Sequence, residues 1–231
     1  MQSVNTQQSV GPNLKPEAAS MPDLPLHRVP LVLATPESLK GYGEIIAHPD
    51  ARKIDIVRWP AKGWRQIDAG TGDQGGTTEG EFEFHWQGDV LKGRNHAVDD
   101  DYVLGWSRQP SETDERKATA PRDHVLIWRA NYHPDGGQLF FPLDGGPFVA
   151  TLALPGDDVT PDSFTAFWFD GGVGLYIYPE IWHDALSPVN DDARFFGRQG
   201  KVHARVQVFF PQEFGCYLAT PLRKELARNS R

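Results

Sequence analysis

The sequence lacks several features that would each point to a particular class of protein. Its 231 residues include a single cysteine, Cys216, so no disulfide can form within the chain, which fits the reducing cytoplasm. No run approaches the ~20 apolar residues of a membrane-spanning helix, and we expect a soluble, cytoplasmic protein. A formal net charge of −8 argues against a nucleic-acid partner, because phosphate binding needs a basic surface.

A long apolar pattern with the period of an α-helix is also missing. Instead, 23 glycines and 19 prolines separate short runs that are rich in aromatic and β-branched residues. In EFEFHWQGDV, for example, Phe82, Phe84 and Trp86 alternate with polar residues, as in a half-buried strand. These patterns predict a mostly β fold with a few short helices.

The domain organisation follows from length and local composition. Residues 1–28 are polar and contain several prolines, so we expect them to form a flexible leader. Because β domains of this size are commonly single units, we expect one domain over residues 29–231. The segment NDDARFFGRQGKVHA, at residues 190–204, is expected to be an excursion before the last strand.

The stretch from Asn131 to Asp184 holds most of the residues that could bind a metal or move a proton. It begins NYHPDGGQLFFPLDGGPF and closes with GGVGLYIYPEIWHD. Each part is typical of two strands joined by a turn that contains glycine or proline. The sequence therefore predicts two hairpins, which direct His133 and His183 toward one site.

The spacing within this stretch resembles that of cupin barrels. The first cupin motif is matched by N-Y-H, four residues, Gln138, six residues and Gly145. The second is matched by the distance from Pro179 to His183. The resemblance implies a cupin-type, RmlC-like jelly-roll β-barrel.

The same residues form a candidate metal site. Two imidazoles and two amide oxygens could hold one divalent ion, such as Ni, Zn, Mn or Fe, with positions left open for substrate. The candidate ligands are Asn131, His133, Gln138 and His183. The alternative is a hydrogen-bonded polar cluster that binds substrate without a metal, and the sequence leaves both open. We expect no organic cofactor.

Further motifs resemble those of one enzyme family. They are YGEII near the start, S-R-Q-P at Ser107–Pro110, and HPDGGQLFFP joined to the downstream Trp182-His183 pair. Together they resemble the ureidoglycolate lyase family over roughly residues 31–187. The resemblance implies a C–N lyase, usually a homodimer, that releases urea and glyoxylate from ureidoglycolate in the allantoin pathway of purine catabolism.

The sequence also departs from the family pattern. Tyr132 stands where the family has an arginine, and Asp184 stands where it has the second histidine of W-H-H. Asn131 and Gln138 take the places of a stronger ligand and a carboxylate. These departures could change the substrate or its mode of binding.

Cleavage of ureidoglycolate needs one base and one acid. Removal of the hydroxyl proton lets the C–N bond break to form an aldehyde, provided that the leaving nitrogen is protonated. His133 and His183 have the ordinary pKa of a base that works at neutral pH. We therefore predict His133, His183 and Asp184 as catalytic residues.

The substrate is expected to be a small anion, with no nucleic acid or membrane as a partner. Arg108, which matches the family's arginine, is predicted to bind its carboxylate, since a planar guanidinium fits a carboxylate with two hydrogen bonds. Tyr132, Gln138 and Tyr176 are predicted to bind the substrate as well. Two alternatives stay open, namely a cupin hydrolase or isomerase for a different hydroxy or ureido acid, and a non-catalytic cupin that binds small acids.

Overall fold

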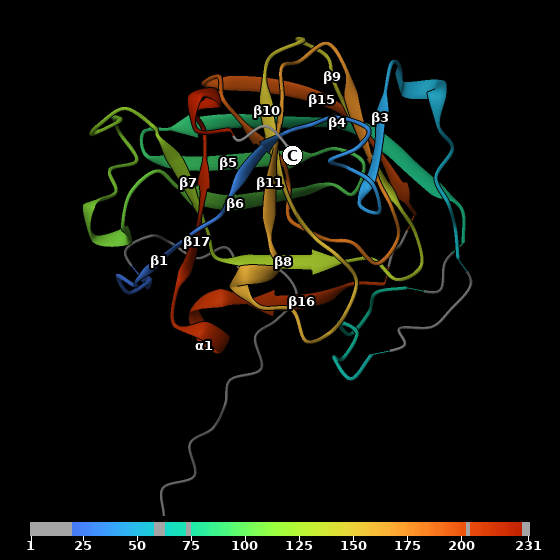
Figure 1. The fold of residues 1–231 in the computed structure, drawn as a ribbon, viewed down its shortest axis with the longest axis horizontal. Helices are drawn as coiled ribbons and strands as arrows, with labels where there is room; N and C mark the ends of the chain where they lie inside the picture. Colours follow the sequence, from blue (N-terminus) through green and yellow to red (C-terminus); the bar gives the residue numbers. More distant parts are fainter. Residues whose placement is uncertain (1–19, 58–62, 73–74, 202–203, 228–231) are drawn as a thin grey trace, which may run out of the picture.

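The computed structural model describes residues 20–57, 63–72, 75–201 and 204–227, and their strands form two sheets that face each other (Figure 1). The ten-stranded sheet has the order β1 (Leu26–Arg28), β17 (Tyr217–Pro221), β7 (His124–Ile127), β6 (Asp100–Trp106), β5 (Val90–Asn95), β4 (Thr77–Gln87), β15 (Asp192–Gly200), β9 (Gln138–Pro142), β12 (Gly174–Ile177) and β3 (Gly43–Ile46). The seven-stranded sheet has the order β16 (Val206–Phe209), β8 (Arg129–Tyr132), β13 (Trp182–His183), β10 (Phe148–Ala153), β11 (Thr165–Phe169) and β2 (Leu31–Leu33), with β14 (Ser187–Pro188) beside β10.

Helices are few and short in the described part of the chain. One α-helix, α1 (Phe210–Phe214), follows β16 directly. The 3-10 turns are η2 (Pro49–Ala51), η3 (Pro110–Glu112), η4 (Pro161–Ser163) and η5 (Lys224–Leu226). No helix among the described residues is long and apolar enough to cross a membrane. The prediction of a mostly β fold is confirmed, in the form of two stacked sheets that hydrogen bonds between the described strands do not close into one barrel.

Aromatic side chains join the two sheets. Phe195 of β15 packs edge-on against Phe148 of β10, with ring centroids 5.2 Å apart, and Phe148 stacks on Phe169 of β11 at 4.4 Å. Phe84 reaches Phe195 from β4 at 5.4 Å. The alternation predicted for β4 is confirmed, because Phe82, Phe84 and Trp86 are buried while the polar residues that follow each of them are exposed. A shared apolar core therefore fixes how the sheets face each other.

Two sequence predictions change at this level. The segment expected to be an excursion contains β15, which lies between β4 and β9 and supplies part of the core, so that prediction is wrong. Its alternating aromatic and polar residues are those of a central strand. The predicted leader includes β1, which pairs in parallel with β17. Residues 1–19 of that leader lie outside the described residues, and the single-domain boundary stays a prediction.

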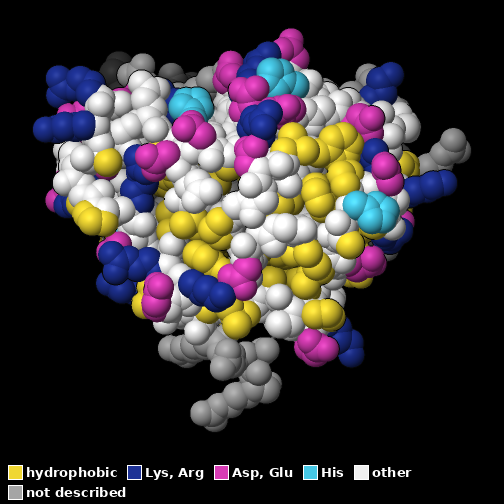
Figure 2. Space-filling model, turned by 90° about the horizontal axis from the view of Figure 1, so that it is seen from above, with side chains coloured by type: hydrophobic (Ala, Val, Ile, Leu, Met, Phe, Trp, Pro, Cys, Tyr) yellow, Lys and Arg dark blue, Asp and Glu magenta, His cyan; other side chains and the backbone are white. Residues whose placement is uncertain are grey.

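The surface mixes apolar and charged side chains. Seen from above, apolar side chains are exposed in several areas, with charged side chains between and around them (Figure 2). Large apolar side chains with at least a third of their surface exposed include Trp64, Leu143 and Leu154. Exposed apolar residues of this kind are normal on folded proteins and identify no particular partner by themselves.

Gly43 offers a test of the pairing between β3 and β12. A Cβ at Gly43 would lie 2.1 Å from the carbonyl oxygen of Tyr176, which is backbone and cannot turn away. We expect Gly43→Ala to lower the free energy of unfolding by roughly 1–3 kcal/mol, measured by urea denaturation. Gly197→Ala is the matched control, because the nearest atom to its Cβ would lie 3.6 Å away. Equal stability of the two variants would contradict the close approach of these strands.

Candidate active site

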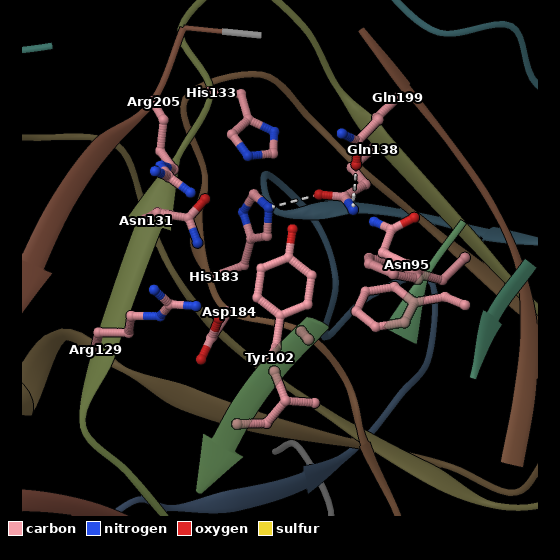
Figure 3. Close-up of a pocket in the computed structure, with 14 residues that line it drawn as sticks. Asn95, Tyr102, Arg129, Asn131, His133, Gln138, His183, Asp184, Gln199 and Arg205 are labelled. Carbon is pink, nitrogen blue, oxygen red and sulfur yellow. Dashed lines mark hydrogen bonds between the residues drawn. The ribbon is translucent and has the colours of Figure 1, made fainter. Parts of the chain in front are cut away.

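A polar pocket lies between the two sheets. It encloses about 470 Å³ of space, part of it open to solvent. Phe82, Leu104 and Phe140 form part of its apolar wall. Its polar lining comes from strands of both sheets and consists of Asn95, Tyr102, Arg129, Asn131, His133, Gln138, His183, Asp184, Gln199 and Arg205 (Figure 3).

Strand geometry explains why these side chains meet. Successive side chains of a strand point to opposite faces, so Arg129 and Asn131 of β8 both enter the pocket while Tyr132 points away. Asn131 lies directly opposite His183 on the neighbouring strand β13. On the other sheet Gln138 of β9 lies opposite Gln199 of β15. The pairing register thus sets the composition of the site.

Each ring nitrogen of His183 lies close to an oxygen atom. Its side chain is buried, with 4% of the residue exposed. The Nδ1 atom lies 2.7 Å from the carbonyl oxygen of Ile181, which can only accept, so Nδ1 carries a proton. The Nε2 atom lies 3.0 Å from Oε1 of Gln138, and Nε2 of Gln138 donates to Oε1 of Gln199 at 3.0 Å (Figure 3). In the neutral ring the lone pair is therefore on Nε2, and the contact with Oε1 of Gln138 becomes a hydrogen bond only when Nε2 is protonated.

Burial sets the protonation state of this histidine. Loss of hydration lowers the pKa of His183 from 6.5 to about 4, while the hydrogen bond to Ile181 acts in the opposite direction. The ring is consequently neutral at neutral pH and can accept a proton at Nε2. The second imidazole, that of His133, is also buried and packs edge-on against His183, with ring centroids 4.8 Å apart.

Arg129 is a buried cation that forms no ion pair with any carboxylate of the described residues. Only 5% of the residue is exposed, and its Nε is buried without a hydrogen-bond partner. Its guanidinium carbon lies 4.7 Å from the centre of the Trp128 ring and 5.9 Å from that of Tyr102. A desolvated charge without a counter-ion is costly. The arrangement suits an anion that enters the pocket.

Other charges lie at the same end of the pocket. Arg205 donates from Nε to Oδ2 of Asp68 at 2.7 Å. Burial raises the pKa of Asp184, whereas the charges of Arg129 and Arg205 act to lower it. In Figure 3, Arg129, Arg205, Asn131 and Asp184 lie on one side, and the amides of Asn95, Gln138 and Gln199 lie on the other. His133, His183 and Tyr102 lie between the two groups.

The structure brings together five of the residues predicted from sequence. Asn131, His133, Gln138, His183 and Asp184 all line the pocket. The prediction of two hairpins is wrong, because β8 and β13 belong to one sheet and β9 and β12 to the other, so each turn connects the two sheets instead of two paired strands.

The other three predicted residues lie outside the pocket. Arg108 pairs with Glu112 near the surface, with Nη2 and Oε2 3.0 Å apart. Tyr132 donates to Oδ1 of Asp157 at 2.9 Å, because its position on β8 places it on the opposite face from Asn131. Tyr176 donates to Oδ2 of Asp55 at 2.8 Å, in a small apolar cluster apart from the pocket.

The sequence prediction missed the two arginines, Tyr102 and two of the amides. For Arg129 a signal was present, since counting back in steps of two from His133 gives Asn131 and then Arg129 on the same face of a strand. Asn95, Tyr102 and Gln199 come from strands whose place beside the histidines depends on the order of strands in the sheet. No local pattern indicates that order.

The donor set does not fit a divalent metal well. Among the described residues no three His, Cys, Asp or Glu side chains come together in a group that could hold a metal. The two imidazoles are accompanied by neutral amides, and two guanidiniums share the pocket. A cation would be repelled by these charges, which favours the metal-free polar cluster, and the candidate metal stays a prediction.

The depressed pKa of His183 predicts a specific dependence of stability on pH. Between pH 6.5 and 4 the unfolded chain binds a proton on this residue that the folded chain does not. Above pH 6.5 the residue is neutral in both states and the free energy of unfolding does not depend on it. As the pH drops from 6.5 toward 4, the free energy of unfolding falls by ~1.4 kcal/mol per pH unit. We expect His183→Gln to lose this dependence in urea titrations across that range. Parallel curves for the two proteins would show that His183 titrates normally.

Comparison with known proteins places the chain among its relatives. The family model for ureidoglycolate lyase matches residues 117–214. The ureidoglycolate lyase of Azotobacter vinelandii is 36% identical over 112 residues, which covers 41% of this chain and 68% of the relative. That of Rhodobacter capsulatus is 38% identical over 82 residues, covering 36% of this chain and 48% of the relative.

A third relative, ureidoglycolate lyase 2 of Rhizobium meliloti, is 36% identical over 63 residues, which covers 27% of this chain and 38% of the relative. The chain thus spans about half the length of most of the curated relatives it matches. The matched residues 117–214 include both histidines, Arg129 and Arg205, and hence most of the polar pocket. On these matches, the chain belongs to the ureidoglycolate lyase family.

Proposed function

We propose that this protein is a C–N lyase that releases urea and glyoxylate from ureidoglycolate. The observation that carries the proposal is the polarity of the pocket, with guanidiniums at one end, amides at the other and two imidazoles between them (Figure 3). Ureidoglycolate has a carboxylate at one end, a ureido group at the other and a hydroxyl-bearing carbon between them. The substrate and the pocket therefore match in the order of their chemical groups.

Arg129 is assigned to the carboxylate. Its guanidinium is desolvated and forms no ion pair among the described residues, although the charge of Asp184 interacts with it, so a bound carboxylate would supply the missing direct contact. A planar guanidinium can donate two parallel hydrogen bonds to a carboxylate. Arg205 adds positive charge at the same end of the pocket, although Asp68 already occupies its Nε.

The ureido group is assigned to the amide end. Urea presents one carbonyl oxygen that accepts and nitrogens that donate, and side-chain amides offer both functions. Asn95, Gln138 and Gln199 supply such groups at this end of the pocket. This part of the pocket is neutral, which suits an uncharged leaving group.

His183 is assigned as the base. Its tautomer is fixed by Ile181, so the neutral ring offers the Nε2 lone pair to the substrate hydroxyl. The hydroxyl proton moves to Nε2, the oxygen forms the carbonyl of glyoxylate, and the C–N bond breaks with its electron pair on nitrogen. Oε1 of Gln138 can then accept a hydrogen bond from the protonated Nε2. His133, which packs on His183, stays the second candidate for this role.

Other expectations stay predictions. They include the homodimer, the cytoplasmic location and a place in purine catabolism, all of which come from the family or from composition. The catalytic role of Asp184 is also untested, and its position beside Arg129 and Arg205 places it at the carboxylate end.

The direct test is release of urea and glyoxylate from ureidoglycolate by the purified protein. We expect turnover that persists after treatment with EDTA and dialysis, because the lining residues provide a base and an anion site without a metal. Loss of turnover with EDTA and its return with one divalent ion would restore the metal-assisted mechanism. Absence of both products, with or without added metal ions, would refute the proposed function.

Arg129→Gln tests the carboxylate site. We expect kcat/KM to fall roughly 10- to 150-fold, since hydrogen bonds to a charged group contribute about 1.5–3 kcal/mol. The unfolding free energy of the variant without ligand should not decrease, because an unpaired buried charge is removed. Arg108→Gln, which alters a guanidinium outside the pocket, is the matched control and should keep the wild-type kcat/KM. Equal effects of both substitutions would contradict the assignment.

A further inference from the structure

Tyr102 differs from four of the other five tyrosines of this chain in the state of its hydroxyl. The hydroxyls of four others donate to protein oxygens, on Asp157, Asp55, Glu44 and Pro22. No hydrogen bond within the described residues uses the hydroxyl of Tyr102, although its ring lines the pocket. In Figure 3 this hydroxyl points toward the side chains of His183 and Gln138.

The ring of Tyr102 is held in place by its neighbours. It extends from β6 and packs against Phe82, with ring centroids 5.8 Å apart. The guanidinium carbon of Arg129 lies 5.9 Å from the ring centre on another side. The phenol is therefore positioned by apolar and cation–π contacts, while its oxygen is left for whatever occupies the pocket.

The proposed reaction needs a proton donor in addition to the base assigned to His183. When the C–N bond breaks, the nitrogen of urea receives an electron pair and would leave as a strongly basic anion unless it is protonated at the same time. The proton donor must lie near the amide end of the pocket, where the ureido group is placed. Asp184 lies instead beside Arg129, at the end assigned to the carboxylate (Figure 3).

We infer that Tyr102 is the catalytic acid that protonates the leaving urea nitrogen, an assignment that rests on the proposed lyase function. The proton of the substrate hydroxyl goes to Nε2 of His183, and the phenolic proton goes to the nitrogen as the C–N bond breaks. The imidazolium then returns its proton to the phenolate, directly or through solvent. Both side chains end in their starting states, and no oxidant, reductant or other reactant is consumed.

The surroundings of Tyr102 agree with this role. Burial raises its pKa to about 12, and the nearby carboxylate of Asp100 acts in the same direction, so the phenol keeps its proton at neutral pH. Arg129 and Arg205 act in the opposite direction and would stabilise the phenolate once it forms, while Asp184 opposes them. A donor next to two guanidiniums can thus lose its proton during turnover without being ionised at rest.

The experiment compares Tyr102→Phe with wild type in the urea-release assay. We expect kcat to fall ~10²- to 10⁴-fold, with KM changed less than about threefold, because the proton is needed only in the transition state. Tyr178→Phe is the matched control and should keep the wild-type kcat, since its hydroxyl bonds to Glu44 outside the pocket. A Tyr102→Phe variant with kcat within about threefold of wild type would overturn the inference.

A second substrate separates an acid from a merely structural tyrosine. α-Hydroxy-N-trifluoroacetylglycine has a leaving group that depends less on protonation, so the deficit of Tyr102→Phe should shrink. An equal deficit with both substrates would overturn the role as acid. If wild type releases no urea at all, the proposed function fails and this role fails with it, whereas failure of Tyr102 alone leaves wild-type turnover intact.

A further measurement covers the case in which Tyr102→Phe does not fold. Incorporation of 3,5-difluorotyrosine at position 102 keeps the shape of the side chain and lowers the pKa of its phenol. The alkaline limb of the kcat profile should then move to lower pH. An unmoved limb in a folded, active protein would exclude Tyr102 as the acid.

Discussion

The alternation of side chains along β8 is the constraint on which the site depends. This strand pairs with β16 along one edge and with β13 along the other. Its two faces look toward different surroundings. One face gives Arg129 and Asn131 to the pocket, and the other gives Ala130 and Tyr132 to the apolar core. A slip of one residue would exchange these faces, placing a guanidinium in the core and a tyrosine in the pocket. The register of one short strand therefore determines both the packing of its sheet and the chemistry beside it.

The pocket carries costs that the rest of the fold must offset. Arg129 is buried and forms no ion pair with a described residue, and His183 is buried in its neutral form. Both arrangements disfavour the folded protein and favour a ligand or a proton-transfer step. The aromatic contacts that join the sheets, such as those of Phe148 and Phe195, supply apolar burial next to this polar region. Stability and reactivity are thus provided by neighbouring stretches of the same strands.

How far the sequence predicts this molecule depends on the range of the interactions involved. Local alternation predicted β4 correctly, and motif spacing predicted that His133, Gln138 and His183 converge. The choice of Arg108 rested on a motif, whereas the residues that line the pocket depend on which face of each strand is turned inward. Gln199 could not be predicted, because its position opposite Gln138 depends on pairing between β15 and β9. Cross-strand register of this kind cannot be predicted from the sequence of any single segment.

The parallel pairing of β1 with β17 has a consequence for how the protein is made. The contact is reinforced by Tyr217, whose hydroxyl donates to the carbonyl of Pro22, 195 residues earlier in the chain. During synthesis β1 leaves the ribosome before its partner, which emerges only after all the strands between them. Until then one edge of the larger sheet has no β1–β17 pair, and contacts of such long sequence separation are slow to form. The nascent chain must therefore keep β1 unpaired, or shielded from other strand edges, until β17 has been synthesised.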